Sequence, residues 1–402
     1  MTASDSDHVD FHTLKSRKDG GEWIIGCQDT GQVVAVPEVG MTAIRLLVAG
    51  HSIDDTRREL RAATQRDVDV RTFVEGLAAS GLVSAIGDRR FPQPLVKVTL
   101  PSVRPHHVRW ALNPLLHAAV LALVMAGVAL VAIRPQILPA WHFMVWSEYG
   151  TFVLATQSLV AWTLIFVHEA AHLLTARAAG VPGRVRLGTR LHFLVAQTEV
   201  SGIWLGRRRE RLTVYLSGLA VDGGIASACL LAIAAGADSP LLPVIVLTLL
   251  YTFANQCLVF MRTDLYFVLQ DLTGCRNLYG DSGAYLRHVM ARLLRRHHID
   301  PLASLRGAER RALRIYSVVQ VTGTAVCLVV AFHLFRDVTW RLVSRSVTVL
   351  MDWPGFLPGI DALATFAVVA GLQLLWARLW WRRHRERVRT VATSAVRPLM
   401  SR

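Results

Sequence analysis

Six long apolar segments constrain the fold of this chain more than any other feature of its sequence. A helix of about 20 residues crosses the hydrocarbon core of a bilayer, and each segment is about that long. They cover residues 111–133, 151–176, 212–234, 241–261, 315–335 and 356–376. The chain is 52% hydrophobic, which exceeds the usual value for a soluble enzyme. The sequence therefore predicts a mainly α-helical, polytopic membrane protein with about six transmembrane helices.

The arginines are distributed unevenly between the loops, and this distribution predicts the topology. Residues 1–20 are polar and charged and lack the apolar core of a secretory signal, so we expect a cytoplasmic amino terminus. The arginine-rich loops 177–211 and 262–314 and the basic tail 382–402 then lie in the cytoplasm, in agreement with the positive-inside rule. The other loops are poorer in arginine, and the main exceptions are Arg336, Arg341 and Arg345. We expect a multi-pass protein of the cell membrane with both termini in the cytoplasm.

The net charge of +15 follows from the same topology. In a soluble protein this charge would suggest a nucleic-acid partner. Here the basic residues follow the predicted cytoplasmic loops, so the lipid bilayer is the expected partner and no nucleic acid is expected.

Residues 21–88 show the pattern of a small α/β domain, with a flexible segment at 1–20 before it and a proline-containing linker at 89–109 after it. Turn residues, the capping pair Ser52 and Asp55, and apolar spacing predict two strands, three short helices and a closing strand: 22–27, 32–36, 41–48, 55–63, 70–77 and 82–86. This order is typical of a winged-helix fold. A DNA-binding winged helix is the alternative, with a contact surface of Arg57, Arg58 and Arg61, but attachment to a membrane argues against it.

The segment 184–206 alternates apolar and polar residues, which favours strands over helix. It follows the second apolar segment directly and is too polar to be a span. We expect a hairpin at the membrane interface, near the end of the second span.

The second apolar segment contains the chemically most informative residues, His168, Glu169 and His172. Histidines four residues apart lie on one face of a helix and can bind one zinc ion, and the glutamate beside them is a candidate general base. Ionisable residues are costly within a membrane span, so their presence there indicates a functional site. The alternative is a polar contact between helices.

A catalytic zinc ion normally has three protein ligands, so the two histidines need a partner. Asp264 is the candidate, because its predicted depth at the cytoplasmic end of the fourth span matches that of the histidines. Asp271 lies two helical turns further on and is the alternative ligand or a residue that supports one.

Three further polar residues are weaker candidates: Asp222, Asn255 and His192. Asp222 lies in the middle of the third span, where it could orient a ligand, line a water path or pair with Asn255. His192 is better interpreted as a structural or substrate-side residue of the hairpin, since catalytic sites usually stop at three protein ligands.

The motif from His168 to His172, followed two spans later by the run from Thr263 to Leu272, resembles the site-2 protease family of intramembrane metallopeptidases. The similarity covers most of residues 150–280. It implies one zinc ion per chain, bound by the two histidines and Asp264, and a water molecule activated by Glu169.

Two other segments carry a resemblance. The stretch from Thr198 to Ser201, with Trp204 and the arginines at 207–209, resembles the bacterial peptide zinc metalloprotease branch of that family. Residues 21–88 resemble the PqqD-like domains that bind leader peptides. Together they imply a membrane domain at 110–381 that cleaves a membrane-associated or leader-bearing peptide.

The chain departs from the family pattern near Asp264. The family usually has glycine after the aspartate and an Asn-Pro pair a few residues before it, where this chain has Leu265 and Leu258-Val259. Without the pair we expect no helix break there, so that either Asn255 replaces it or catalysis is impaired. The alternative function is a non-catalytic membrane scaffold that binds a leader peptide for maturation, export or immunity. A transporter ranks last, because the paired half-repeats of many carriers are missing.

Overall fold

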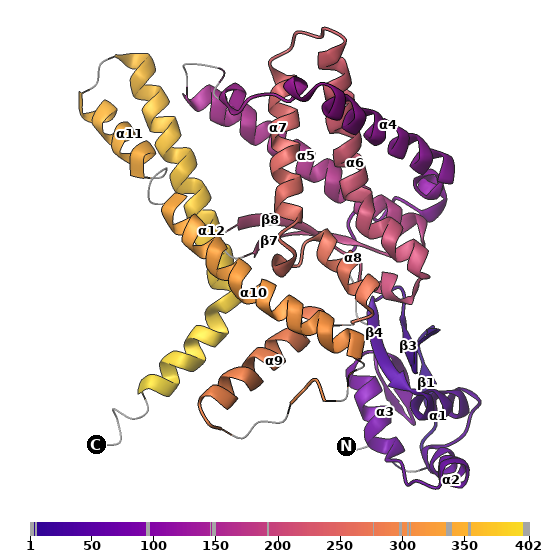
Figure 1. Ribbon diagram of the computed structural model, residues 1–402. Helices are drawn as coiled ribbons and strands as arrows, with labels where there is room; N and C mark the ends of the chain where they lie inside the picture. The colour runs from indigo at the N-terminus through magenta and orange to yellow at the C-terminus, as the bar shows by residue number, and fades with distance from the viewer. Residues whose placement is uncertain are drawn as a thin grey trace. The chain divides into compact units, whose positions relative to one another are not determined.

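The structure is a computed structural model, in which the described residues are 4, 6–93, 97–144, 146, 150–190, 193–275, 277–296, 300–303, 305, 307–334, 340–352 and 355–396. Most of them are helical (Figure 1), as expected. Contacts group the chain into two compact units. The first comprises Met1–Ala119, Glu169–Arg186 and Thr198–Gly218, and the second comprises Val120–His168, Leu187–Gln197 and Leu219–Arg402.

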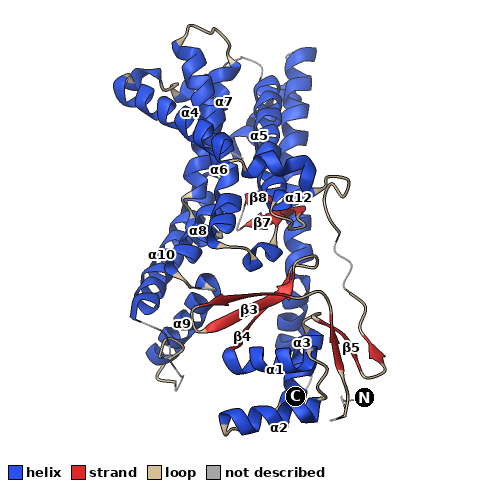
Figure 2. Cartoon of the chain, turned by 90° about the vertical axis from the view of Figure 1, so that its right-hand side faces the viewer, coloured by secondary structure: helices blue, strands red, loops and turns tan. Residues whose placement is uncertain are grey.

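The N-terminal domain contains the predicted strands and helices. Its elements are β1 (Val9–Phe11), β2 (Lys15–Asp19), β3 (Glu22–Cys27), β4 (Gln32–Pro37), α1 (Glu38–Val48), α2 (Ile53–Thr64), α3 (Val70–Ala79), β5 (Val83–Ile86) and β6 (Arg89–Arg90). The strands form two antiparallel sheets, in the orders β2-β3-β4 and β1-β5-β6 (Figure 2). Both sheets and all three helices contribute to one core, which includes Ile25, Val36, Leu47, Val74 and Val83.

The expectation of a flexible segment at 1–20 is wrong for its second half. Val9 is buried and pairs with Ile86, and β2 pairs with β3 from Asp19–Glu22 to Lys15–Gly26. The connection between β2 and β3 is Gly20-Gly21, and a two-residue loop of this kind is a strong hairpin signal because glycine accepts positive φ. All five residues of β2 are polar or charged, so hydrophobic periodicity alone does not reveal the strand.

The expected linker at 89–109 is also partly structured. Arg89 and Arg90 form β6, and residues Pro105–Leu112 form a 3₁₀ helix, η1. Between them, the backbone N–H of Thr99 donates to the carbonyl oxygen of Gly183 at 3.0 Å. The start of the linker therefore extends the sheet of the N-terminal domain. Its middle contacts the polypeptide that follows the second apolar segment.

The predicted capping pair begins α2. The backbone N–H of Asp55 donates to Ser52 Oγ, and the Ser52 hydroxyl donates to the Asp55 carboxylate at 2.6 Å. The second of these bonds lowers the pKa of Asp55 from its ordinary value, since it stabilises the charged form.

Ser52→Ala should raise the hydrogen-exchange rates of the α2 amides in the full chain about five-fold at neutral pH. Because the pKa of Asp55 is lowered on folding, the stabilisation is present above the ordinary aspartate pKa and is lost as the pH falls through the lowered value. The difference between the variant and the wild type should therefore become smaller in acid, where the bond from the Asp55 backbone N–H to Ser52 Oγ still remains in the wild type. The control is Ser80→Ala, since the Ser80 hydroxyl bonds only within α3, to Gly76. A constant difference between Ser52→Ala and wild type at every pH would contradict the role of Asp55.

Five helices in the described residues are long and apolar enough to cross a membrane, which makes this a membrane protein by length and composition. They are α4 (Pro114–Ile133), α5 (Gly150–Ala178), α6 (Arg208–Ala234), α10 (Gly307–Leu334) and α12 (Phe356–Val396). Small residues allow close packing between α4 and α6, because a side chain at Gly127 would collide with Ser227. The other α-helices described after residue 256 are α8 (Asp264–Thr273), α9 (Leu278–Leu293) and α11 (Trp340–Asp352).

The predicted fourth span, 241–261, is not one continuous helix. Helix α7 (Leu241–Gln256) has 16 residues and is followed by a 3₁₀ turn, η5 (Val259–Met261). Leu258 leaves the helical region with ψ at 62°, and Arg262 is left-handed with φ at 60°. Hydropathy did not place this break, because the apolar segment resumes directly after Asn255 and Gln256 and continues to Met261.

The expected hairpin is present as β7 (Arg184–Arg190) and β8 (Phe193–Glu199). It leads into the 3₁₀ helix η4 (Ser201–Leu205), which packs against β3 and β4 of the N-terminal domain. A Cβ atom added at Gly202 would lie 2.8 Å from the carbonyl oxygen of Gln28, so the two backbones are in close contact. Arg17 also donates to the carbonyl oxygen of Trp204 at 3.3 Å.

Candidate metal centre

Helix α5 places His168 and His172 one turn apart, on the same face. Both side chains are buried, with exposed fractions of 5% and 6%. The remaining residues of this segment are mostly apolar and support a continuous helix. The spacing read from the sequence thus places two imidazoles side by side.

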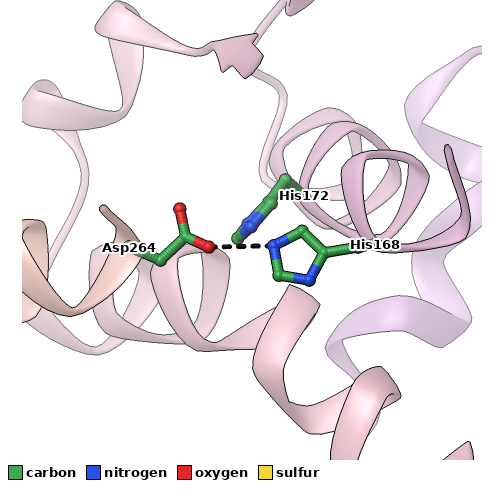
Figure 3. Close-up of side chains that lie close together, drawn as sticks. All are labelled: His168, His172 and Asp264. Carbon is green, nitrogen blue, oxygen red and sulfur yellow. Dashed lines mark hydrogen bonds and ion pairs between the residues drawn. The ribbon is translucent and has the colours of Figure 1, made fainter. Parts of the chain in front are cut away.

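Asp264 is the first residue of α8 and completes a group of three possible ligands. His168, His172 and Asp264 each offer one ligand atom, and these atoms all lie within 4.8 Å of one another. His168 Nε2 and Asp264 Oδ2 are 2.9 Å apart, and the His168 ring faces the carboxylate in Figure 3. The structure thus brings together the three residues predicted from the sequence, as a group that could hold a metal ion.

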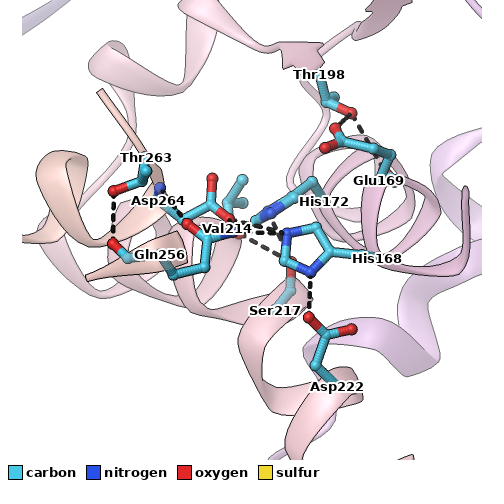
Figure 4. A network of polar contacts seen from close by, with 10 residues as sticks. All are labelled: His168, Glu169, His172, Thr198, Val214, Ser217, Asp222, Gln256, Thr263 and Asp264. Carbon is cyan, nitrogen blue, oxygen red and sulfur yellow. Dashed lines mark hydrogen bonds and ion pairs between the residues drawn. The ribbon is translucent and has the colours of Figure 1, made fainter. Parts of the chain in front are cut away.

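Hydrogen bonds on the other ring nitrogens orient both histidines (Figure 4). His172 Nδ1 lies 2.7 Å from the carbonyl oxygen of Val214, which can only accept, so Nδ1 carries the proton and Nε2 has the lone pair. His168 Nδ1 lies 2.7 Å from Asp222 Oδ2. A carboxylate or carbonyl behind a histidine is the usual support of a metal-binding imidazole.

The short distance between His168 Nε2 and Asp264 Oδ2 indicates whether a cation fits between these residues. When His168 Nδ1 donates to Asp222, Nε2 presents a lone pair, and the Asp264 oxygen 2.9 Å away also presents lone pairs. Such a contact is favourable only with a proton or a cation between the two atoms. Two imidazoles and one carboxylate are a common protein ligand set of catalytic zinc, so the residues fit zinc.

Glu169 is buried beside the histidines but is outside the group of three. Its Oε2 atom accepts a hydrogen bond of 2.6 Å from the hydroxyl of Thr198 on β8 (Figure 4). The hydroxyl oxygen of Thr198 also lies 3.2 Å from the backbone carbonyl oxygen of Glu169. The hairpin therefore positions the carboxylate, a role of Thr198 that sequence reasoning missed.

Gln256 is the second residue that sequence reasoning missed. Its amide nitrogen donates to Asp264 Oδ2 at 2.8 Å, and its side-chain oxygen accepts from the Asp264 backbone N–H at 3.0 Å. Its carbonyl oxygen accepts from the Thr263 hydroxyl at 2.7 Å. One residue at the end of α7 thus fixes the start of α8 and the orientation of Asp264.

The expectation that the chain lacks a helix break near Leu258-Val259 is therefore wrong. The break occurs without the Asn-Pro pair, because the Gln256 carbonyl bonds with Thr263 instead of continuing the helix. Asn255 does not replace the pair, since its amide donates to the Tyr251 carbonyl oxygen at 2.8 Å within α7. The available signal for Gln256 was a polar side chain inside the predicted apolar segment 241–261.

The remaining candidates have separate outcomes. Asp222 orients His168, which is one of the alternatives considered for it, and the hydrogen bonds found for Asn255 do not include one to Asp222. Asp271 lies in α8 but does not belong to the group of possible ligands found among the described residues. His192 lies outside the described residues.

Gln256→Ala should weaken zinc binding about 10- to 100-fold, the usual effect of removing a residue that holds a metal ligand. The substitution removes both side-chain bonds to Asp264. Competition with a chromogenic chelator measures the affinity. Asn255→Ala is the matched control, because it removes a polar side chain one position earlier whose bond stays within α7. Equal affinities of Gln256→Ala and wild type would show that Asp264 needs no such support.

Comparisons with protein-family models, with curated proteins and with solved structures found no match to this chain. The function of this chain must therefore be inferred from the geometry of the site.

Proposed function

We propose that this protein is an intramembrane zinc peptidase that hydrolyses a peptide bond in a membrane-associated or leader-bearing peptide. The observation that carries the proposal is the group of His168, His172 and Asp264, with three possible ligand atoms within 4.8 Å of one another. The buried hydrogen bonds behind both imidazoles support it, since each uses Nδ1 and fixes the orientation of its ring, as is usual for metal-binding histidines. A zinc ion held there would act as a Lewis acid on the peptide carbonyl and would lower the pKa of a water molecule.

The side chains around the group have separate roles in this proposal. Asp222 and the Val214 carbonyl hold the imidazole rings, and Gln256 holds Asp264. Glu169 is the general base, which accepts a proton from the attacking water at a carboxylate oxygen and returns it to the leaving amine. The Thr198 hydroxyl keeps that carboxylate in one orientation.

The substrate reaches the site as an extended segment in this proposal, because a helix hides its carbonyl groups in internal hydrogen bonds. The β7-β8 hairpin forms a two-stranded sheet, and a peptide could pair with one of its edges. In the N-terminal domain, β2 and β4 are the outer strands of their sheet, which suits the capture of a leader peptide in the same way. We place both termini and the opening of the site in the cytoplasm, on the basis of the arginine-rich loops.

The test is incubation of the purified, zinc-loaded chain in lipid nanodiscs with peptides encoded by neighbouring genes, followed by mass spectrometry. Cleaved peptides support the proposal. Peptides that are bound tightly and returned intact contradict it and support the scaffold alternative, which Leu265 in place of the family's glycine would also suit.

A further inference from the structure

A basic cavity lies between α9 and the start of α10, and its lining does not include the residues of the metal group. Its volume is about 540 Å³, and its lining includes Tyr285, His288, Arg292, Arg295, Asp300 and Arg314. The two helices pack against each other (Figure 1) and are joined by buried polar contacts. The hydroxyl oxygens of Ser282 and Ser317 are 2.9 Å apart, and the Ser282 hydroxyl donates to Gln320 at 2.6 Å. The walls of the cavity are therefore held by the core of the second unit.

The charges in this cavity suit an anion. Arg292, Arg295 and Arg314 contribute three guanidinium groups, and none of them forms an ion pair with an acidic side chain among the described residues. The acidic residue of the lining is Asp300, and its carboxylate already accepts from the backbone N–H of Leu302 at 2.9 Å. Guanidinium groups bind phosphate through paired hydrogen bonds, so a phosphate group is the anion that this set fits best.

The surroundings of the cavity suit a lipid. Leu293 is 73% exposed on α9 and Ile315 is 67% exposed on α10, each next to an arginine of the cavity. Met290, Leu294 and Val318 are also exposed. Helix α10 is one of the five apolar helices, and Arg314 lies in its first turns. Basic residues beside exposed apolar side chains, at the end of a membrane span, are the setting in which anionic headgroups bind.

We propose that this cavity binds the phosphate group of an anionic phospholipid, whose acyl chains lie along the exposed apolar side chains of α9 and α10. The positive-inside rule accounts for arginines in this loop, but it does not account for three of them around one cavity. This proposal does not depend on the peptidase activity.

The test compares lipid binding by the full chain in detergent, measured by native mass spectrometry with phosphatidylglycerol and with phosphatidylcholine. We expect the anionic lipid to bind more tightly than the zwitterionic lipid. Arg314→Ala and Arg292→Ala should each weaken its binding about five-fold. Arg287→Ala is the matched control, because Arg287 is an exposed arginine of α9 outside the cavity lining, and it should leave binding unchanged.

Three results would overturn the proposal. Equal loss in Arg287→Ala and Arg314→Ala would mean that the lipid responds to overall charge. Equal binding of the two lipids would exclude recognition of the anionic headgroup. Displacement of the lipid by equimolar glycerol 3-phosphate would assign the cavity to a soluble phosphate compound. An unfolding temperature in detergent within a few degrees of the wild type shows that the variants are folded, and Arg292→Gln provides a milder second variant.

Discussion

Glu169→Gln should lower the rate of peptide hydrolysis by about 10²- to 10⁴-fold, the usual contribution of a general base, while the zinc content stays that of the wild type. Glutamine has the size of glutamate and can still accept the hydrogen bond from Thr198, but its amide cannot take a proton from water. Zinc should remain because Glu169 does not belong to the group of possible ligands. Mass spectrometry of the peptide products and elemental analysis of the protein measure the two quantities.

Glu199→Gln is the matched control for this substitution. Glu199 follows Thr198 on β8, but its carboxylate is more exposed and pairs with Arg186 at 3.1 Å. This variant should cleave the peptide at nearly the wild-type rate. Wild-type activity in Glu169→Gln would remove Glu169 from the mechanism, and loss of zinc together with activity would show a structural role instead.

Asp264→Ala should remove zinc from the purified protein, with an affinity lowered by more than about 100-fold. A substitution behind a metal ligand already costs about 10- to 100-fold, and this one removes one of three protein ligands. Asp271→Ala should retain zinc, because Asp271 is outside the group although it lies on the same helix. The pair of variants therefore separates the predicted ligand, Asp264, from its alternative, Asp271.

Elemental analysis after dialysis against a weak chelator measures the zinc retained by each protein. The unfolding temperature in detergent, measured for each protein after its zinc has been removed, serves as the control for folding, and both variants should then unfold within a few degrees of the zinc-free wild type. Zinc retained by Asp264→Ala but lost from Asp271→Ala would transfer the ligand role to Asp271.

The central part of the site could be predicted because it depends on local geometry. His168 and His172 need only the helical period, and Asp264 follows from matching depths along two apolar segments. Gln256 could not be predicted, because its role depends on where α7 ends. That end is fixed by contacts with Thr263 and Asp264 across a non-helical turn.

The N-terminal domain shows the same limit. Its three helices and the β3-β4 hairpin carry local apolar periodicity and caps, and they agree with the predicted ranges to within a few residues. Strand β1 has three residues and β2 is entirely polar, so they become strands only through pairing with β5 and β3. Pairing of this kind is not encoded in the hydrophobic period of either strand.

The contact between Gly202 and Gln28 has a consequence for how this protein can be engineered or can diverge. The N-terminal domain is not attached through a flexible linker alone. Its β3-β4 turn packs against the backbone of Gly202, which lies shortly after the hairpin that carries Thr198. A domain transplanted onto this membrane part would need a β3-β4 turn of the same shape. With the original domain, any side chain at position 202 would collide with the existing turn. Domain exchange between relatives should therefore require the exchange of two segments together, the β3-β4 turn and residues 198–205.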